Sequence, residues 1–240
     1  MKQKISAIIL TYNEELNLEQ CLKSIADLVS ETIIVDSGST DKTLEIAKRY
    51  GAKIYEHQFT NQAEQFNWAL DNIDIKNDWI LKLDADEYVL PELKEEIEKT
   101  LPKTPVDISG FYIKRRVYFV GRWIRHGGYY PIWFLRLWRY GSGRSEDRKM
   151  DEHIILLNGK AEKLKNDFVD DNQNGLKAWM EKHKKYALRE AEEVYGERYG
   201  KGDKRNFYYR TPAFLRVFFY FIYRYFFRLG FLDGISGTIF

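Results

Sequence analysis

The sequence predicts an α/β protein in which a mostly parallel sheet is flanked by helices and is followed by a helical, amphipathic C-terminal extension. Short apolar runs alternate with amphipathic helical patterns over residues 5–101, and a polar turn follows most of the runs. In residues 211–229, arginines fall on one side of a helix and aromatic residues cover the rest. Strands that alternate with helices join by right-handed crossovers, so the first pattern indicates a Rossmann-like architecture.

The individual elements follow from local periodicity. Strands are expected at residues 5–10, 32–35, 53–56, 79–83, 110–120 and 154–157. Helices are expected at residues 18–25, 44–50, 62–72, 91–101 and 175–199. Residues 121–140 are interpreted as an aromatic and basic loop region, whose rings and arginines suit a phosphorylated sugar. Two domains are expected, residues 1–172 with an acceptor-side region from about 110, and residues 173–240.

Composition bounds the class of protein. A chain of 240 residues can bury a full core, and 44% hydrophobic with 31% charged residues excludes a disordered protein. The net charge of +2 hides a segregation, because residues 113–148 hold nine Lys or Arg against two acids and residues 201–240 hold seven against two. These regions favour an anionic partner such as a phosphate, a nucleic acid or an anionic membrane.

The single cysteine and the amino-terminal residues indicate in which cellular compartment the protein is expected. Cys21 cannot form an intrachain disulfide, and it shares a helical stripe with Leu18 and Leu22, so it is expected to be a packed core thiol. The first residues lack the pattern of a signal peptide. A cytoplasmic location is therefore expected.

Two carboxylates end the fourth strand, in the segment Asp84-Ala85-Asp86. At positions i and i+2 they can converge on one hard divalent cation, and Ala85 leaves room for a ligand. The alternative is an Asp-rich turn that caps the following helix. The spacing alone leaves both interpretations open.

Two further polar turns should lie at the same edge of the sheet, because parallel strands end on one side. These turns are residues 11–14 and 36–41. Neither contains a dinucleotide or phosphate-loop glycine motif, which disfavours NAD and ATP. The hydroxyl-rich turn with Asp36 suits a ribose or a base, and an ordinary helix cap is the alternative.

Together these motifs resemble family 2 glycosyltransferases with the GT-A fold. The matching segments are Thr-Tyr-Asn-Glu at 11–14, Val-Asp-Ser-Gly-Ser-Thr-Asp at 35–41 and Leu-Asp-Ala-Asp-Glu at 83–87. The longer segment 80–87 and Met-Asp-Glu-His at 150–153 resemble the lipopolysaccharide-core β-1,4-glucosyltransferase branch. The resemblance implies an inverting, metal-dependent transfer of a hexose, glucose in that branch, from a UDP-sugar to a saccharide of lipopolysaccharide core or another lipid-linked glycan. A polyprenyl-phosphate glycosyltransferase is the alternative.

The resemblance also implies residue roles. Thr11, Asn13, Glu14 and Asp36 match positions that hold the base and ribose. Asp84 and Asp86 match the pair that contacts ribose and a Mg²⁺ or Mn²⁺ ion, with Asp86 nearest the metal. Asn67 matches a further donor contact, although Phe66 stands where a basic residue commonly precedes it.

A catalytic base is expected near residue 152. An inverting transfer needs a carboxylate that accepts the proton of the acceptor hydroxyl. Glu152 is the first candidate, because related members have His-Glu at this point, and Asp151 is the second. The alternative is a solvated turn paired with Arg148 and Lys149. Arg189, in the long helix, is a candidate pyrophosphate clamp or a surface arginine.

The tail suggests a membrane contact. Its longest uncharged run, residues 217–223, is seven residues and is too short to cross a bilayer. Arginines opposite a wide aromatic face are typical of a helix lying in the interface of an anionic membrane, so peripheral contact through 205–230 at the inner membrane face is expected. An oligomerisation helix is the alternative.

Two other functions remain open on sequence alone. An Asp-x-Asp phosphohydrolase would use Asp84 as nucleophile, but Glu87-Tyr88 replaces the small hydroxyl-bearing turn expected there. A module that binds nucleic acid or membrane without catalysis would use the arginines and aromatic rings. No nucleic-acid partner is expected for the glycosyltransferase.

Overall fold

The computed structural model describes residues 3–146, 153–196 and 212–240. The chain divides into two compact units. The first contains residues 1–117 and 131–173, and the second contains residues 118–130 and 174–240. The second unit thus begins close to residue 173 and also includes the hairpin at 118–130.

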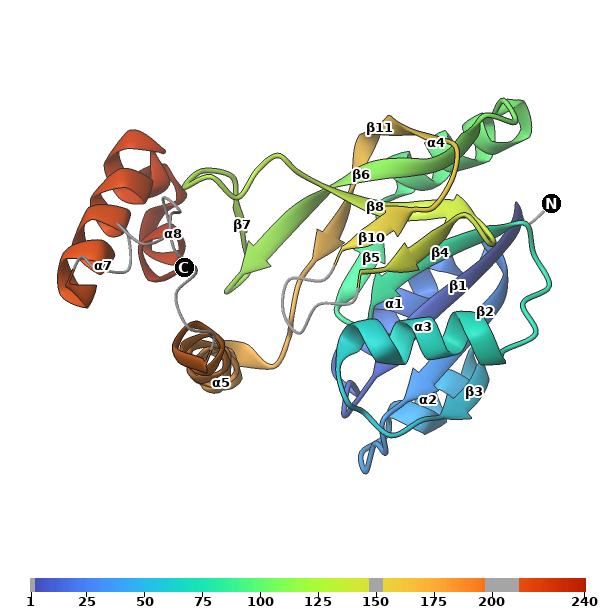
Figure 1. Cartoon of the computed structure of the whole chain (residues 1–240), viewed down its shortest axis with the longest axis horizontal. Coiled ribbons are helices and arrows are strands. Elements are labelled where there is room, and N and C mark those ends of the chain that lie inside the picture. Colours follow the sequence, from blue (N-terminus) through green and yellow to red (C-terminus); the bar gives the residue numbers. More distant parts are fainter. Residues whose placement is uncertain (1–2, 147–152, 197–211) are drawn as a thin grey trace. The chain divides into compact units, whose positions relative to one another are not determined.

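The first unit is built on one sheet, and strand β6 of this sheet continues into the hairpin of the second unit, which contains β7 (Figure 1). Within the described ranges its strand order is β3-β2-β1-β4-β8-β6-β11-β5, and β7 pairs with β6. The strands are β1 (Gln3–Thr11), β2 (Val29–Asp36), β3 (Lys53–Glu56), β4 (Trp79–Asp84), β5 (Glu87–Val89), β6 (Ile108–Phe119), β7 (Arg122–Ile124), β8 (Ile132–Arg139) and β11 (Lys160–Asp170). A separate ribbon pairs β9 (Gly143–Ser145) with β10 (Ile154–Leu156). Strands β3, β2, β1 and β4 are parallel neighbours, which confirms the predicted mostly parallel sheet.

Helices cover both faces of this sheet because its central strands are apolar on both sides. Ile5 and Ile9 of β1 pack with α1 (Leu18–Ile25), α2 (Thr43–Arg49) and α4 (Pro91–Thr100). Ile8 faces the other way and packs with α3 (Gln62–Asn72), which crosses the front of the sheet in Figure 1. A short 3₁₀ turn, η1 (Leu101–Lys103), follows α4. Cys21 is buried in the first of these cores, as predicted.

The prediction of a loop over residues 121–140 is wrong for residues 122–124, which form β7, and for residues 132–139. The second of these segments is β8, an internal strand that pairs antiparallel with both β4 and β6. Leu137 and Trp138 are completely buried there, and Arg136 is only 5% exposed. The arginines mask the strand pattern in the sequence, because the carboxylates that compensate Arg136 lie some 50 residues earlier in the chain. Strand β11 is a further strand that the sequence did not predict. Its first half contains mostly charged residues and too few apolar residues to show a strand pattern.

The second unit is mainly helical. It contains α5 (Gly175–Gly196), α7 (Ala213–Ile222), the π-helical turn η2 (Tyr223–Phe227), the 3₁₀ turn η3 (Gly230–Asp233) and α8 (Gly234–Ile239). Trp179 of α5 packs against Phe119 and Phe240. Leu176 and Met180 of α5 are exposed, although their helical spacing with Trp179 predicts an inward-facing stripe.

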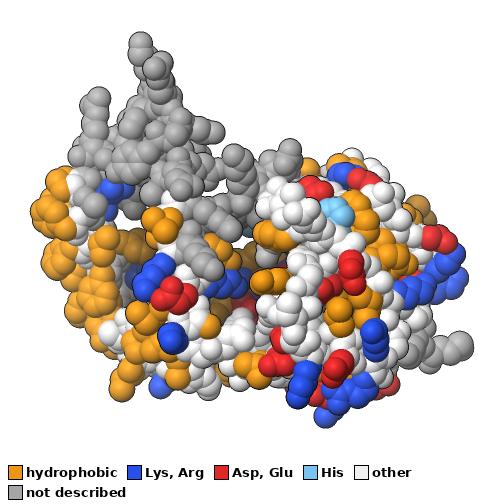
Figure 2. Space-filling model, turned by 90° about the horizontal axis from the view of Figure 1, so that it is seen from below, with side chains coloured by type: hydrophobic (Ala, Val, Ile, Leu, Met, Phe, Trp, Pro, Cys, Tyr) orange, Lys and Arg blue, Asp and Glu red, His pale blue; other side chains and the backbone are white. Residues whose placement is uncertain are grey.

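The surface of the second unit is unusually apolar. The exposed aromatic side chains of its helical tail include Phe214, Phe218, Phe219, Tyr220, Tyr223, Phe226 and Phe227. Figure 2 shows hydrophobic side chains gathered over this part of the molecule, with Lys and Arg side chains beside them. Over the described residues, no helix combines the length and apolar character needed to cross a bilayer.

Candidate active site

Three parallel strands end together and define the candidate site. In the registers of the sheet, Thr11 of β1 lies beside Asp36 of β2, and Leu10 of β1 lies beside Asp84 of β4. Asp36 and Asp84 therefore flank the end of β1 and stand about 10 Å apart, at two strand spacings. The turns at 11–14, 36–41 and 84–86 meet at one edge, as the sequence predicted.

Asp36 shapes the turn that follows β2. It is completely buried, and its Oδ1 accepts hydrogen bonds from the hydroxyls of Thr11 (2.8 Å) and Ser39 (2.6 Å). Its Oδ2 accepts from the backbone N–H groups of Gly38 (2.9 Å) and Ser39 (2.7 Å). Gly38 has φ +87°, in the left-handed region that favours glycine. The carboxylate thereby fixes the backbone of a hydroxyl-rich turn at the edge of the site.

The first turn is joined to this second turn. Asn13, with φ 54°, donates its N–H to Ser39 Oγ (2.9 Å) and accepts from Thr40 N–H at Oδ1 (2.8 Å). The backbone N–H of Glu14 donates to Thr43 Oγ1 (2.7 Å). Asn tolerates the left-handed conformation better than most residues, which explains its place at this sharp bend. The two turns form one hydrogen-bonded ledge, called the hydroxyl ledge below (residues 11–14 and 36–43).

Asp84 is held by a buried ion pair. Arg136 donates through Nη2 to Asp84 Oδ2 (3.2 Å) and also to Glu87 Oε1. The other oxygen of Glu87 accepts the backbone N–H of Asp84 (2.9 Å). Burial raises the pKa of Glu87 to about 8, because desolvation outweighs the attraction of Arg136. Although burial opposes it, the carboxylates of Glu87 and Asp84 raise the pKa of Arg136, which stays charged.

Asp86 is contacted by the segment that follows β11. Asn172 donates from Nδ2 to Asp86 Oδ2 (2.8 Å), and the backbone N–H of Asp171 donates to the carbonyl oxygen of Asp86 (3.0 Å). Burial and the charge of Asp86 raise the pKa of Asp171. The sequence analysis assigns no role to this segment, although its polar run Asp-Asp-Asn-Gln-Asn at 170–174 is typical of a polar site at the end of a strand.

The chemistry of this carboxylate pair fits a small divalent cation. Mg²⁺ is usually held by one or two carboxylates, with water and substrate phosphates as the remaining ligands, and Asp84 and Asp86 supply two carboxylates. Both are partly exposed at the edge of the sheet. Within the part of the chain that the structure describes, no cluster of three or more His, Cys, Asp or Glu residues is arranged to hold a metal by itself. In a bound complex, water and phosphate oxygens would supply further ligands to such an ion.

The side chain of Asn67 binds the backbone of β9. Its side chain accepts the backbone N–H of Ser145 (3.0 Å) and donates to the carbonyl oxygen of Ser145 (3.0 Å), so α3 is tied to β9. Gln65 lies two positions before Asn67 in α3 and reaches the hydroxyl ledge, where its side-chain amide donates a hydrogen bond to Ser37 Oγ (3.0 Å). It is completely buried and also contacts His57 Nδ1 (2.8 Å). The sequence reasoning singled out neither Gln65 for this contact nor His57.

The remaining predicted site residues are not placed at this edge by the structure. Asp151 and Glu152 lie outside the described residues. Arg189 lies in α5 of the second unit, and its side chain is outside the described part.

Comparison with known proteins identifies the family. Residues 6–158 match Glycosyl transferase family 2, which covers more than half of the chain and all three turns of the site. The chain therefore belongs to the family 2 glycosyltransferases, and the sheet described above agrees with the GT-A fold expected for it.

Individual relatives cover less of the chain. It is 32% identical over 165 residues to the lipopolysaccharide core biosynthesis glycosyltransferase LpsC of Rhizobium meliloti (strain 1021), a match that covers 64% of this chain and 58% of LpsC. It is 44% identical over 98 residues to an uncharacterized glycosyltransferase of Rickettsia bellii (strain RML369-C), covering 41% and 33% of the two chains. Among solved structures, S. aureus TarS (residues 1–349) matches with 26% identity and a TM-score of 0.40, covering 49% of this chain and 36% of TarS. The matches thus span between about a third and 58% of these relatives.

Proposed function

We propose that the protein transfers a hexose from a UDP-sugar to a saccharide acceptor with inversion at the anomeric carbon. The observation that carries this proposal is the meeting of the hydroxyl ledge with Asp84 and Asp86 at the carboxyl ends of β2, β1 and β4, within a chain of family 2. Ligands of parallel α/β sheets bind in the crevice at such strand ends.

The two parts of the edge suit the two parts of a sugar nucleotide. The hydroxyl ledge offers Asn13, Glu14 and the turn fixed by Thr11 and Asp36 to the base and the ribose. Asp84 and Asp86 lie next to the ledge and face the diphosphate. A bound Mg²⁺ or Mn²⁺ would neutralise negative charge on the departing nucleoside diphosphate. Arg136 and Asn172 orient the two carboxylates for that role.

Proton transfer is assigned to the segment after β9. Glu152, with Asp151 as the second candidate, accepts the proton of the acceptor hydroxyl while that oxygen attacks the anomeric carbon. The leaving nucleoside diphosphate departs on the opposite face, which inverts the configuration. Arg189 is proposed as a further contact to the pyrophosphate.

The acceptor is proposed to be a saccharide of lipopolysaccharide core or another lipid-linked glycan. Similarity to LpsC supports this choice, and transfer to a polyprenyl phosphate is the alternative. The exposed aromatic tail supports a peripheral location on the inner face of the cell membrane, which would bring the enzyme close to a lipid-linked acceptor.

Calorimetric titration with UDP, in the presence and absence of Mn²⁺, tests the donor and metal assignments. We expect Mn²⁺ to strengthen UDP binding, and Asp86→Ala to remove that gain. UDP binding that is indifferent to Mn²⁺ would contradict the metal role. A screen of UDP-sugars scored by UDP release then identifies the donor.

The base is tested separately. Glu152→Gln should abolish transfer while UDP binding is retained, because the amide keeps the size of the side chain and loses its basicity. Loss of UDP binding in this variant would contradict the assignment. Asp151→Asn is the matched control, and it should keep most of the activity if Glu152 is the base.

A further inference from the structure

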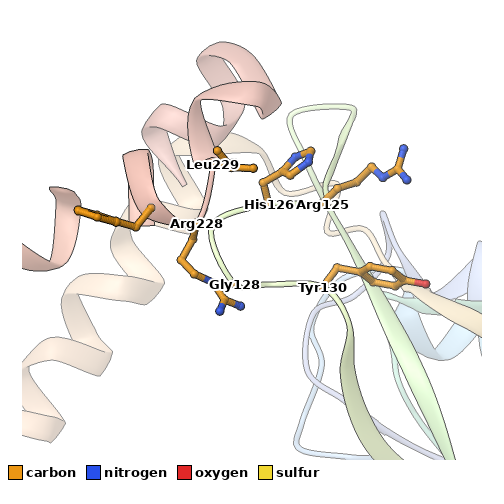
Figure 3. A pocket seen from close by; sticks show the side chains of 7 residues that line it. Arg125, His126, Gly128, Tyr130, Arg228 and Leu229 are labelled. Carbon is orange, nitrogen blue, oxygen red and sulfur yellow. The ribbon is translucent and has the colours of Figure 1, made fainter. Parts of the chain in front are cut away.

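The second unit contains a pocket that belongs to none of the proposed catalytic groups. It has a volume of about 300 Å³ and is lined by Arg125, His126, Gly128, Tyr130, Phe227, Arg228 and Leu229. These residues come from two segments, the hairpin loop 125–130 and the turn 227–229 after the tail helix (Figure 3). Both segments belong to the same compact unit.

The loop is held in a defined shape by the tail. Asp233 is 3% exposed, and its carboxylate accepts the backbone N–H groups of Arg125 (2.9 Å) and His126 (2.7 Å) and contacts His126 Nδ1 (2.8 Å). The N–H of Gly127 donates to the carbonyl oxygen of Arg228 (2.9 Å), and Arg224 donates back to the carbonyl oxygen of Gly127 (2.9 Å). The shape of the pocket is therefore fixed by hydrogen bonds between the loop and the tail.

Two glycines allow this close packing. Gly127 and Gly128 have φ of +66° and +88°, conformations that other residues rarely adopt. A Cβ on Gly127 would meet the guanidinium of Arg224 at 3.3 Å, and one on Gly128 would meet that of Arg228 at 3.5 Å. The Gly-Gly pair thus lets two arginine side chains lie directly against the loop backbone.

The electrostatics of this region favour an anion. Residues 118–130 and 212–240 contain five arginines and a single acid, Asp233. That acid is buried and engaged by the loop, so it does little to offset charge at the surface. Over the described ranges, neither Arg125 nor Arg228 forms an ion pair with a carboxylate, and both are exposed.

The arrangement of the cations points to an array of phosphates rather than to one bound ion. In Figure 3 the guanidinium groups of Arg125 and Arg228 lie on different sides of the loop and do not meet at one point. Phe227 and Leu229, which line the same pocket, are 76% and 45% exposed, and they continue into the exposed aromatic surface of the tail. A soluble phosphate would leave these apolar groups in water, whereas a bilayer surface accommodates both the cations and the rings.

We propose that this surface, residues 125–130 and 227–229, is the membrane-contacting site of the protein, in which Arg125 and Arg228 contact the phosphates of anionic phospholipids and Phe227 and Leu229 enter the interface. The proposal rests on the membrane location proposed above, and it assigns that contact to particular residues. It requires no spanning helix, because cations and a few buried rings suffice for peripheral binding.

Co-sedimentation of the full chain with lipid vesicles tests the site. One set of vesicles is phosphatidylcholine alone, and the other contains about a third phosphatidylglycerol. The wild-type chain should bind the second set preferentially. The double variant R125Q/R228Q should lose on the order of 30-fold in partitioning to those vesicles, at roughly one lipid-charge interaction for each arginine.

The matched control is K48Q/K103Q, which removes the same charge from exposed positions of the first unit. Its partitioning should stay close to that of the wild type. Equal losses in the two double variants would overturn the proposal, since the attraction would then depend on net charge alone. Arg125→Gln serves as a second variant, because this guanidinium group is exposed and packs on the ring of Trp123, so its loss should not affect folding.

Two further experiments distinguish a lipid headgroup from a free phosphate ion as the ligand, and the membrane site from the donor site. Phe227→Ser should weaken binding to both kinds of vesicle. Calorimetric binding of inorganic phosphate without any vesicle binding would overturn the lipid assignment and indicate a soluble phosphate ligand. Because UDP binding is measured without vesicles, failure of the donor assignment and failure of this membrane site are distinguishable.

Discussion

The guanidinium group of Arg136 on β8 donates a hydrogen bond of 3.2 Å to Oδ2 of Asp84 at the end of β4. The same group pairs with Glu87, whose second oxygen accepts the backbone N–H of Asp84. Both the side chain and the backbone of Asp84 are thus held by one buried ion pair. This contact joins the antiparallel part of the sheet to the candidate active site.

Removing one partner of this pair should be costly. Arg136→Met leaves Glu87 and Asp84 without their cation, and we expect the free energy of unfolding to fall by about 3–5 kcal/mol. Urea denaturation followed by circular dichroism measures the loss at pH 9, above the raised pKa of Glu87, where both carboxylates are charged. The double variant R136M/E87Q should be less destabilised than the sum of its single variants, because it also removes a buried carboxylate. Additive single effects would contradict the coupling.

The turn after β2 depends on the charge of Asp36. Asp36→Asn places an amide N–H₂ group against backbone and hydroxyl donors, so we expect a loss of about 3 kcal/mol in the free energy of unfolding and weaker UDP binding. Ser39→Ala is the milder control, since it removes one hydroxyl donor to Asp36 and the acceptor of the Asn13 N–H, and it should cost about 2 kcal/mol. Denaturant titration and calorimetry give the two readouts. Unchanged stability of Asp36→Asn would show that the turn does not need its carboxylate.

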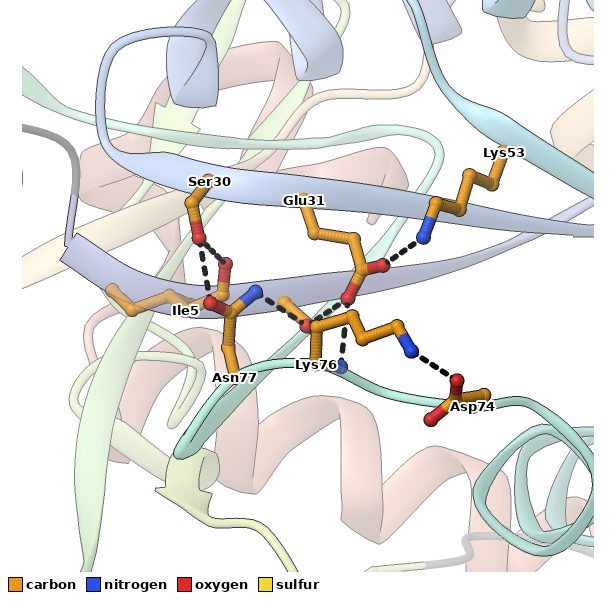
Figure 4. A network of polar contacts seen from close by, with 8 residues as sticks. Ile5, Ser30, Glu31, Lys53, Asp74, Lys76 and Asn77 are labelled. Atoms are coloured by element: carbon orange, nitrogen blue, oxygen red, sulfur yellow. Dashed lines mark hydrogen bonds and ion pairs between the residues drawn. The ribbon is translucent and has the colours of Figure 1, made fainter.

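A polar network at the other end of the strands should make stability depend on pH. Glu31 of β2 accepts hydrogen bonds from Ser6 of β1, Lys53 of β3 and the backbone N–H of Lys76 (Figure 4). Burial acts to raise the pKa of Glu31, but these contacts outweigh it and lower the pKa from its usual 4.5. The stabilisation is therefore fully present above pH 4.5 and is lost as the pH falls through the folded-state pKa.

The variant Glu31→Gln tests this dependence. Below pH 4.5 the free energy of unfolding should fall less steeply in the variant than in the wild type, because the variant has no carboxylate to protonate at this position. Glu95→Gln, at an exposed position of α4, is the control and should retain the wild-type slope. A slope in Glu31→Gln equal to that of the wild type would refute the role of the network.

The sequence predicted the first half of the fold well because its signals are local. Strands β1 to β4 are apolar runs that end in polar turns, and the helices between them show clear periodicity. Strand β8 was missed because Arg136 interrupts its apolar pattern, and only Glu87 and Asp84, distant in sequence, make its burial possible.

For the candidate site, the sequence likewise predicted the residues at the strand ends but not their long-range contacts. Motifs at strand ends predicted that Asp36, Asp84 and Asp86 share one edge of the sheet, since the rule that parallel strands end together needs only strand order, and the roles of these residues stay predictions. The contacts of Asn172 with Asp86 and of Gln65 with Ser37 join residues far apart in the chain, and no local pattern announces them. The structure was needed to find these partners.

Asn67 offers a final test of what the structure adds. Its resemblance to a donor-binding position predicts contact with the sugar nucleotide, whereas in the structure its amide both donates to and accepts from the backbone of Ser145. We expect Asn67→Ala to lower the free energy of unfolding by about 1–2 kcal/mol, as two hydrogen bonds between α3 and β9 are lost. The affinity for UDP should stay within about twofold of the wild type, a difference well under 1 kcal/mol. Asn72→Ala, at an exposed position of the same helix, is the control and should change neither quantity appreciably. A folded Asn67→Ala variant with strongly weakened UDP binding would instead place Asn67 at the donor, and the bridge to β9 would then be secondary.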